Sequence, residues 1–186
     1  MISTLIKEVT ASSDTTVSFV DGTSSVVFDS TYDHYMFVCY DLNPEDDAAF
    51  FQFQVNATDD AGGGYDTSQI HSTHHQVWNL STGGSDEDTN YNTSHDLDEA
   101  ASFQHLSSGI GNGADESAAG ILHIFSPAST TYMKQFFSRF TTHHATNYVY
   151  GNYVQGYIND ATAIDEIQFK MTSGDWDGVI QMYGIA

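Results

Sequence analysis

Short runs in which hydrophobic and polar residues alternate make up much of this chain. In the run Ala163–Met171, the odd-numbered residues from Ile167 onward are apolar and the even-numbered ones are polar. The run Val179–Ile185 repeats the pattern, with Ile180 and Met182 on its apolar face. Alternation with a period of two is typical of strands that are buried on one side. Because Ser, Gly and Asp fill the residues between the runs, they predict an antiparallel pair joined by a turn, closing a sheet at the C-terminus.

Similar runs recur on both sides of a more polar middle. The predicted strands are Ile2–Val9, Thr15–Val20, Ser25–Phe28, His34–Leu42 and Ala49–Asn56, then one around Gln69–Leu80, and finally Gly120–Phe125, Thr131–Phe140, Tyr148–Ile158, Ala163–Met171 and Val179–Ile185. Asp21-Gly22 is a hairpin signal between two of them. Short strands at this spacing, without helical periodicity, predict an all-β fold, an antiparallel β-sandwich that is jelly-roll-like.

The middle of the chain, at about 57–117, is polar and rich in glycine and offers little to bury. Besides the strand around Gln69–Leu80, it predicts long polar loops and at most one short helix, around Leu97–Leu106, whose first turn Asp98 and Glu99 would suit. We expect residues 1–186 to form a single β-sandwich domain, with 57–117 as a loop-rich insertion at one end. Such loops are where binding surfaces usually lie.

The charge balance is strongly acidic. Against 25 Asp and Glu stand only 4 Lys and Arg, which gives a formal net charge of −21. This argues against nucleic acid and anionic membranes as partners, because binders of phosphates need a positive surface. The acidity indicates cation binding, mimicry of a polyanion, or a solvated surface that keeps the protein soluble. No apolar run is long enough to span a bilayer, and no basic segment precedes an apolar stretch near the start.

Two features bear on metal binding and redox chemistry. His71, His74 and His75 would share a face on a helix, as zinc ligands often do, but on the expected strand His74 faces away from the other two. The alternative is loop histidines without a metal. Cys39 is the only cysteine, so no disulfide within the chain can form, and its apolar surroundings predict a buried thiol.

A second candidate ion site lies in the acidic stretch Asp86–Asn90. Asp86, Asp88 and Asn90 begin like a calcium loop, but Tyr91 stands where an EF-hand needs glycine and Leu97 where it needs glutamate. Irregular Ca²⁺ binding is one interpretation and a solvated charge cluster is the other. We expect no cofactor, with Ca²⁺ at this stretch as the alternative.

Aromatic residues offer a further hint, because an aromatic face matches the apolar face of a sugar ring. The candidates for glycan contact are Trp78, Trp176, Tyr150 and Tyr153. Core packing and subunit contacts are the competing explanation. No Gly-x-Ser-x-Gly elbow or other catalytic motif stands out, so we expect a protein that is not an enzyme.

The last third of the chain carries a resemblance. Gly120–Tyr132, Tyr153–Ile158, Ala163–Met171 and Gly178–Ile185 resemble a group of small structural proteins from tailed bacteriophages, chiefly marine ones. These share a strand that ends in a Pro-Ser-Thr-Thr-type turn and a terminal strand that ends in Tyr-Gly-Ile. The first block fits the pattern modestly and the middle loops hardly at all.

The resemblance implies a virion structural role: a tail-fibre or adhesin component, or a protein that decorates the capsid. We expect a virion surface or tail location and a homo-oligomer, most simply a homotrimer. The expected partners are other virion proteins and a host-surface glycan, with no nucleic acid and no membrane insertion. Tail-fibre receptor binding is the first interpretation and capsid decoration the second. The alternative from another class is a free carbohydrate-binding, lectin-like module.

Overall fold

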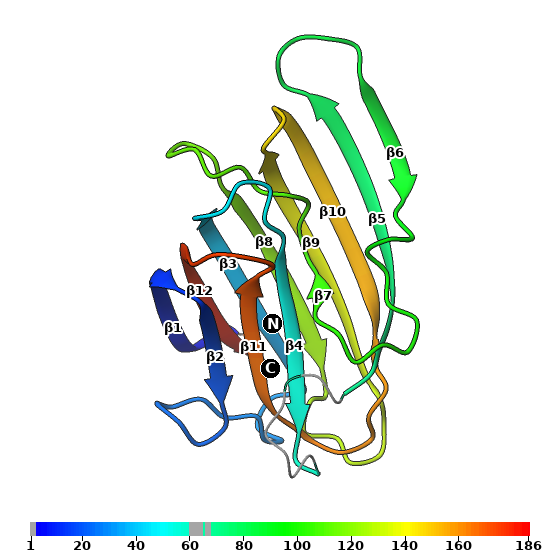
Figure 1. Cartoon of the computed structure of the whole chain (residues 1–186). Coiled ribbons are helices and arrows are strands. Elements are labelled where there is room, and N and C mark those ends of the chain that lie inside the picture. The colour runs from blue at the N-terminus through cyan, green and yellow to red at the C-terminus, as the bar shows by residue number, and fades with distance from the viewer. Residues whose placement is uncertain (1–2, 60–64, 66–67) are drawn as a thin grey trace.

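A computed structural model describes residues 3–59, 65 and 68–186. Ile2 of the first predicted strand and residues 60–64 of the glycine-rich stretch lie outside these residues. The described chain is all-β (Figure 1) and contains no helix able to cross a membrane. Its strands are β1 Ser3–Asp14, β2 Thr16–Val20, β3 His34–Pro44, β4 Phe51–Ala57, β5 Ile70–Leu80, β6 Glu87–Tyr91, β7 Gln104–His105, β8 Ala118–Phe125, β9 Lys134–His144, β10 Tyr148–Ile158, β11 Ile164–Met171 and β12 Trp176–Ile185.

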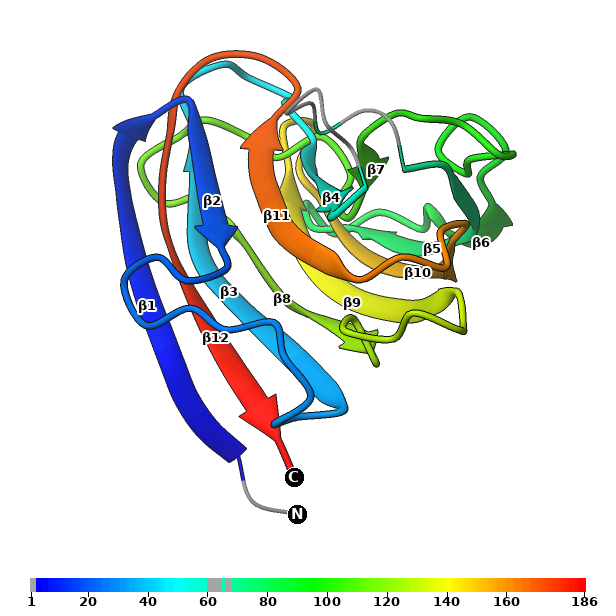
Figure 2. The ribbon, with the colours of Figure 1, turned by 90° about the horizontal axis from the view of Figure 1, so that it is seen from below.

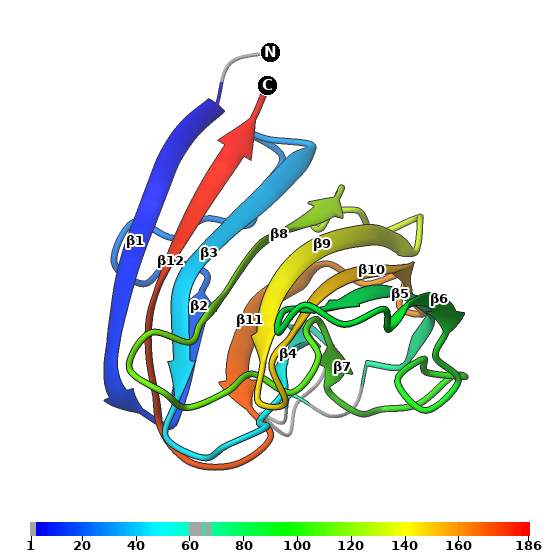
Figure 3. The ribbon, with the colours of Figure 1, turned by 90° about the horizontal axis from the view of Figure 1, so that it is seen from above.

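Two antiparallel sheets pack as a sandwich. The large sheet has eight strands in the order β1-β12-β3-β8-β9-β10-β5-β6, and the small sheet has four in the order β2-β11-β4-β7. Figure 2 shows β2, β11 and β4 lying against one face of the large sheet, and Figure 3 shows the first strand, β1, beside the last strand, β12. The chain crosses between sheets at most of its early connections and then meanders through β8, β9 and β10. The unequal sheets depart from the eight strands of a plain jelly roll.

The two C-terminal strands, β11 and β12, form as predicted but pair with other strands than expected. Both runs are strands, and Ile167, Phe169, Ile180 and Met182 are buried as their alternation predicts. The strands are not paired with each other, however: β11 pairs with β2 and β4, and β12 pairs with β1 and β3. The turn between them therefore crosses from one layer to the other. Alternation identifies the buried face of each strand, and it is the same whether the next strand lies beside it or opposite it.

Two other predicted elements are absent from the described structure. Ser25–Phe28 is not a strand; Gly22 forms the turn with a φ of 74°, and Val26 and Phe28 fold into the core as irregular chain. The helix predicted around Leu97–Leu106 is wrong as well. That segment is irregular chain ending in β7, and its apolar ends pack on the core while Gln104 makes hydrogen bonds that a helix would not allow.

An aromatic core fills the space between the sheets. Phe51 on β4 stacks on Phe169 with ring centres 5.6 Å apart and meets the edge of Trp176 at 5.5 Å. All seven residues of β4 are buried, including the polar Gln52, Gln54 and Asn56. The buried side chain of Gln54 has hydrogen-bond partners, because its amide N–H groups donate to the carbonyl oxygens of Ser68 and Ser102, which lie over the small sheet.

Candidate functional site

The far end of the large sheet projects beyond the small one. In Figure 1, β5, β10 and β6 extend past the ends of β4 and β11. Strands β5 and β10 are paired from Ile70↔Ile158 to Leu80↔Tyr148, so their even-numbered residues share the inner face, which looks toward the small sheet. Their odd-numbered residues form the outer face. The inner face of this pair carries the candidate site.

Along the inner face the side chains change in character. Near the start of β5 they are apolar, at the level of Ile70 and Ile158. A buried polar layer follows, containing Ser72, His74 and Gln76. The last level, where the small sheet no longer covers the strands, is aromatic. The end of the sheet thus presents aromatic side chains that the core does not use.

Four side chains form this aromatic level, and we call them the aromatic platform: Trp78, Tyr148, Tyr150 and His144. Trp78 and Tyr150 are cross-strand partners that stack with ring centres 5.7 Å apart and planes 26° from parallel. The ring of Tyr150 also lies 4.9 Å from that of His144 and 6.0 Å from that of Tyr148. All four are half-buried. Tyr150 is therefore the centre of a continuous aromatic surface.

Carboxylates from the edge of the sheet border the platform. The Tyr148 hydroxyl donates a hydrogen bond of 2.6 Å to Asp86, and this bond raises the pKa of Tyr148. Burial, and then the charge of Asp86, raise the pKa of Tyr150. Asp88 is the cross-strand neighbour of Trp78, so its side chain lies on the same face. Asp86 and Asp88 therefore give the border of the platform a negative charge and several hydrogen-bond acceptors.

His144 adds a defined donor to this border. Its Nδ1 accepts a 3.1 Å hydrogen bond from the backbone N–H of Thr146. Burial lowers the pKa of His144, which favours the neutral ring, and the proton of that ring then lies on Nε2. The platform therefore combines stacking surfaces, carboxylate acceptors and one neutral N–H donor. These are the groups that bind a polyhydroxylated ring.

Positive charge is remote from the platform. All four basic residues are described, and each has a position elsewhere: Lys7 on β1, Lys134 buried at the start of β9, Arg139 on the outer face beside Tyr153, and Lys170 over the ring of Phe103. No cation therefore offsets Asp86 and Asp88. An anionic ligand would be repelled here.

A buried polar network lies directly beneath the platform. We call residues 92–112 the cover segment, because they close the sandwich between β4 and the β5–β10 pair. Oδ1 of Asn152 accepts hydrogen bonds from Gln76 at 3.0 Å, Ser108 at 2.8 Å and His74 at 3.2 Å. Asn152 is itself fully buried. The network ties the cover segment to the sheet and gives the platform a fixed floor.

Three histidines pack together beside that network. The rings of His74 and His95 are 5.3 Å apart, and those of His95 and His105 are 5.0 Å apart. Burial lowers the pKa of both His74 and His105 to about 4. His95 is shifted in the same direction by burial, with Asp96 opposing the shift. Nδ1 of His74 and Nδ1 of His105 are buried without a hydrogen-bond partner.

The two candidate ion sites do not assemble into metal clusters. His71 and His75 lie on the outer face of β5, His71 stacked on Tyr157 and His75 bonded to Thr89, while His74 points inward as the strand pattern predicts. Asp86, Asp88 and Asn90 precede or occupy β6, an extended strand and not a loop. Within the described residues, no group of three or more His, Cys, Asp or Glu is placed to hold a metal ion.

The four glycan candidates have three different locations. Trp78 and Tyr150 meet in the platform. Tyr153, an odd-numbered residue of β10, lies on the outer face. The prediction that Trp176 contacts a glycan is wrong, because its side chain is 1% exposed and packs in the core. Sequence reasoning missed His144, although the three-residue turn before Tyr148 is a signal that the two residues pair across a hairpin.

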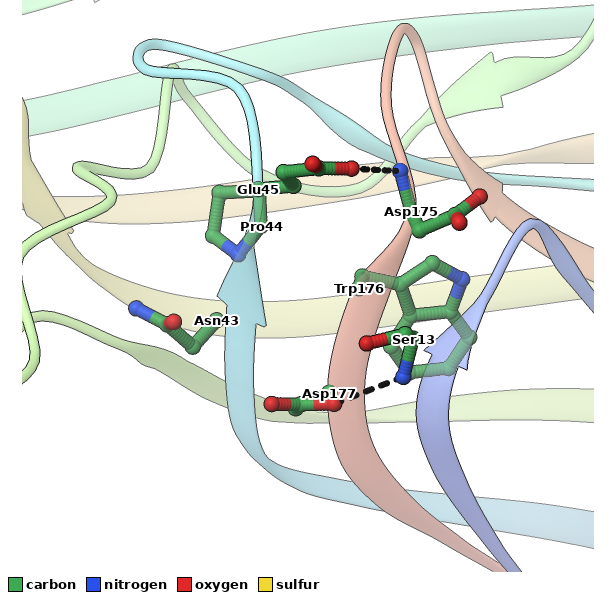
Figure 4. A pocket seen from close by; sticks show the side chains of 7 residues that line it. All are labelled: Ser13, Asn43, Pro44, Glu45, Asp175, Trp176 and Asp177. Atoms are coloured by element: carbon green, nitrogen blue, oxygen red, sulfur yellow. Dashed lines mark hydrogen bonds between the residues drawn. The ribbon is translucent and has the colours of Figure 1, made fainter.

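Trp176 also lines a hollow on the far side of the large sheet from the platform, where β1, β12 and β3 lie together (Figure 4). Glu45, Asp175 and Asp177 surround it, and each already accepts a hydrogen bond from the protein, as Asp177 does from the backbone N–H of Ser13 at 2.8 Å. These carboxylates hold together the turns around the hollow. The hollow therefore has a structural explanation, whereas the platform has none.

In comparisons with protein families, with curated proteins and with solved structures, nothing matches this chain.

Proposed function

We propose that this chain is a non-enzymatic structural protein of a tailed-phage particle, a tail-fibre component whose aromatic platform binds a glycan on the host surface. The observation that carries the glycan site is the stacked pair of Trp78 and Tyr150 on a part of the sheet that covers no core. The virion role is supported by the resemblance of the C-terminal third to small phage structural proteins. A β-sandwich with a binding surface at one end suits both roles.

Charge narrows the class of glycan. Asp86 and Asp88 border the platform, and the chain as a whole carries a formal net charge of −21. A sugar that carries a carboxylate or phosphate would have to approach against this field. We therefore propose a neutral sugar or an amino sugar as the preferred ligand.

Binding of the purified full chain to an array of neutral, amino and acidic glycans tests this proposal. Trp78→Ala should weaken binding by about 30-fold, since losing a central aromatic contact typically costs about 2 kcal/mol. Tyr132→Ala is the matched control, because Tyr132 is 73% exposed on a loop away from the platform. Equal binding by both variants, or a preference for acidic glycans, would refute the glycan proposal.

Capsid decoration is the second candidate, favoured by the outer face of β8, β9, β10 and β5, whose outward-facing residues include no Asp or Glu and which suits lattice contacts. Immunogold labelling of purified particles separates the two. Gold along the tail supports the tail-fibre proposal, and gold over the head supports decoration. Absence of the chain from particles would contradict both and favour a free lectin-like module.

A further inference from the structure

The outer face of the large sheet carries a concentration of exposed apolar side chains. It lies on β8, β9, β10 and β5, opposite the aromatic platform, and we call its apolar part the outer patch. The outer patch consists of Ile121, Phe137, Val149, Tyr153 and Val77, each at least 36% exposed. A soluble chain seldom exposes so many large apolar groups together without a binding partner.

Strand pairing makes the patch continuous. Ile121 pairs with Arg139, and Arg139 pairs with Tyr153, so these side chains form one row across three strands. The next row contains Phe137 beside Gln155. The patch is one surface and not a set of scattered residues.

The same face is almost free of charge. None of the outward-facing residues of β8, β9, β10 and β5 is Asp or Glu, although the chain contains 25 of them. Its only charged side chain is Arg139, whose guanidinium lies 5.5 Å from the centre of the Tyr153 ring. Two carboxylates reach the outward-facing histidines of this face: Glu116 contacts His143 at 3.2 Å and Asp98 contacts His71 at 3.5 Å.

The face also has hollows between its ridges. One lies over Gly151 and is walled by Val77, Arg139 and Tyr153. A Cβ at position 151 would come within 2.9 Å of Val77, so glycine keeps this hollow open. A second hollow lies over Gly156, beside the stacked rings of His71 and Tyr157. Ridges and hollows on one face allow that face to interlock with a copy of itself.

We propose that the outer patch packs against a second copy of this chain. Two chains of charge −21 repel each other unless they meet through a face without carboxylates, and this face satisfies that condition. Four strands about 4.8 Å apart and about nine residues long cover about 600 Å² in projection. Because the side chains project unevenly from the sheet, the accessible surface of this face is larger than its projection and approaches the roughly 800 Å² per partner of a stable interface.

This interface is independent of the glycan proposal. The platform and the outer patch use opposite faces of β5 and β10, so the assembly leaves the platform open. Failure of glycan binding would leave the interface proposal unchanged, and a monomeric chain would leave the platform unchanged.

The test is the molar mass of the full chain by size-exclusion chromatography with light scattering. At about 50 μM and at high salt, we expect a mass of twice 20.4 kDa. Phe137→Asp should yield monomers, with self-association weakened by about 100-fold or more, because it places like charges across the interface. Tyr132→Asp, the same kind of change on an exposed loop, should keep the wild-type mass.

A second variant distinguishes loss of the interface from misfolding of the chain. Gln155→Glu is nearly isosteric, lies in the middle of the patch and should also yield monomers. Salt gives a further signature: NaCl should strengthen association, since it screens the repulsion between the acidic copies and leaves the uncharged contact intact. A wild-type chain that stays monomeric at high salt, or oligomers that persist in both patch variants, would overturn the proposal.

Discussion

Acid should destabilise this protein through the buried histidines under the cover segment. The pKa values of His74 and His105 are held at about 4, against an ordinary value of 6.5. Below pH 6.5 these two histidines bind protons in the unfolded chain, whereas in the folded chain they bind protons only as the pH approaches about 4. The stability contributed by the two neutral imidazoles is therefore present above pH 6.5 and is lost as the pH falls toward 4.

The size of the effect follows from these values. At pH 5, an imidazole with a pKa of about 4 in the folded state and 6.5 in the unfolded state costs about 2 kcal/mol relative to pH 7. His74 and His105 together should lower the free energy of unfolding by about 4 kcal/mol. His95 acts in the same direction, because burial also lowers its pKa.

Urea denaturation at pH 7 and pH 5, followed by tryptophan fluorescence, measures this loss. The lower pH stays above the sequence pI of about 4.2, where the chain loses its net charge and would aggregate. The double variant His74→Gln/His105→Phe should remove most of the difference. Gln at 74 keeps a donor for Asn152, and Phe at 105 keeps the stack on Phe50.

His75→Gln is the matched control, since His75 is exposed on the outer face of β5. It should leave the pH dependence as in the wild type. If the double variant loses as much stability between pH 7 and pH 5 as the wild type does, the buried histidines are not the cause.

Two further predictions concern the core. Phe51→Ala should lower the free energy of unfolding by about 3–5 kcal/mol, because it leaves a cavity beside Phe169 and Trp176; a shift of the urea midpoint no larger than that of Tyr132→Ala would contradict this. Burial raises the pKa of the Cys39 thiol, so it should react with a thiol-specific reagent only when the chain unfolds. Rapid labelling in native buffer would contradict this.

The sequence predicts the strands better than their partners. Alternation located β11 and β12 and their buried residues, but not the sheet to which each belongs. Pairing depends on contacts between distant parts of the chain, and the period-two pattern contains no information about them. Short polar strands such as β6 were invisible for another reason: an edge strand with every residue exposed has no hydrophobic pattern.

The candidate site was predictable in part. Trp78 and Tyr150 were named as aromatic candidates, yet their stacking requires the pairing of β5 with β10, which are separated by about seventy residues. Trp176 has the same chemistry as Trp78, and only the fold places one in the core and the other at the open end. The buried network around Asn152 was likewise hidden, because polar residues in a sequence do not reveal that they will be buried together.

Strand β10 belongs to two surfaces at once, and this affects how the protein can evolve. Tyr148 and Tyr150 belong to the platform, while Val149 and Tyr153 lie on the outer face. Substitutions at positions 148 and 150 therefore leave the opposite face untouched, and substitutions at positions 149 and 153 leave the platform untouched. Deletion of one residue within β10 would exchange the two faces together. Point substitution can diversify this strand, whereas a change in its length would disrupt both surfaces in a single step.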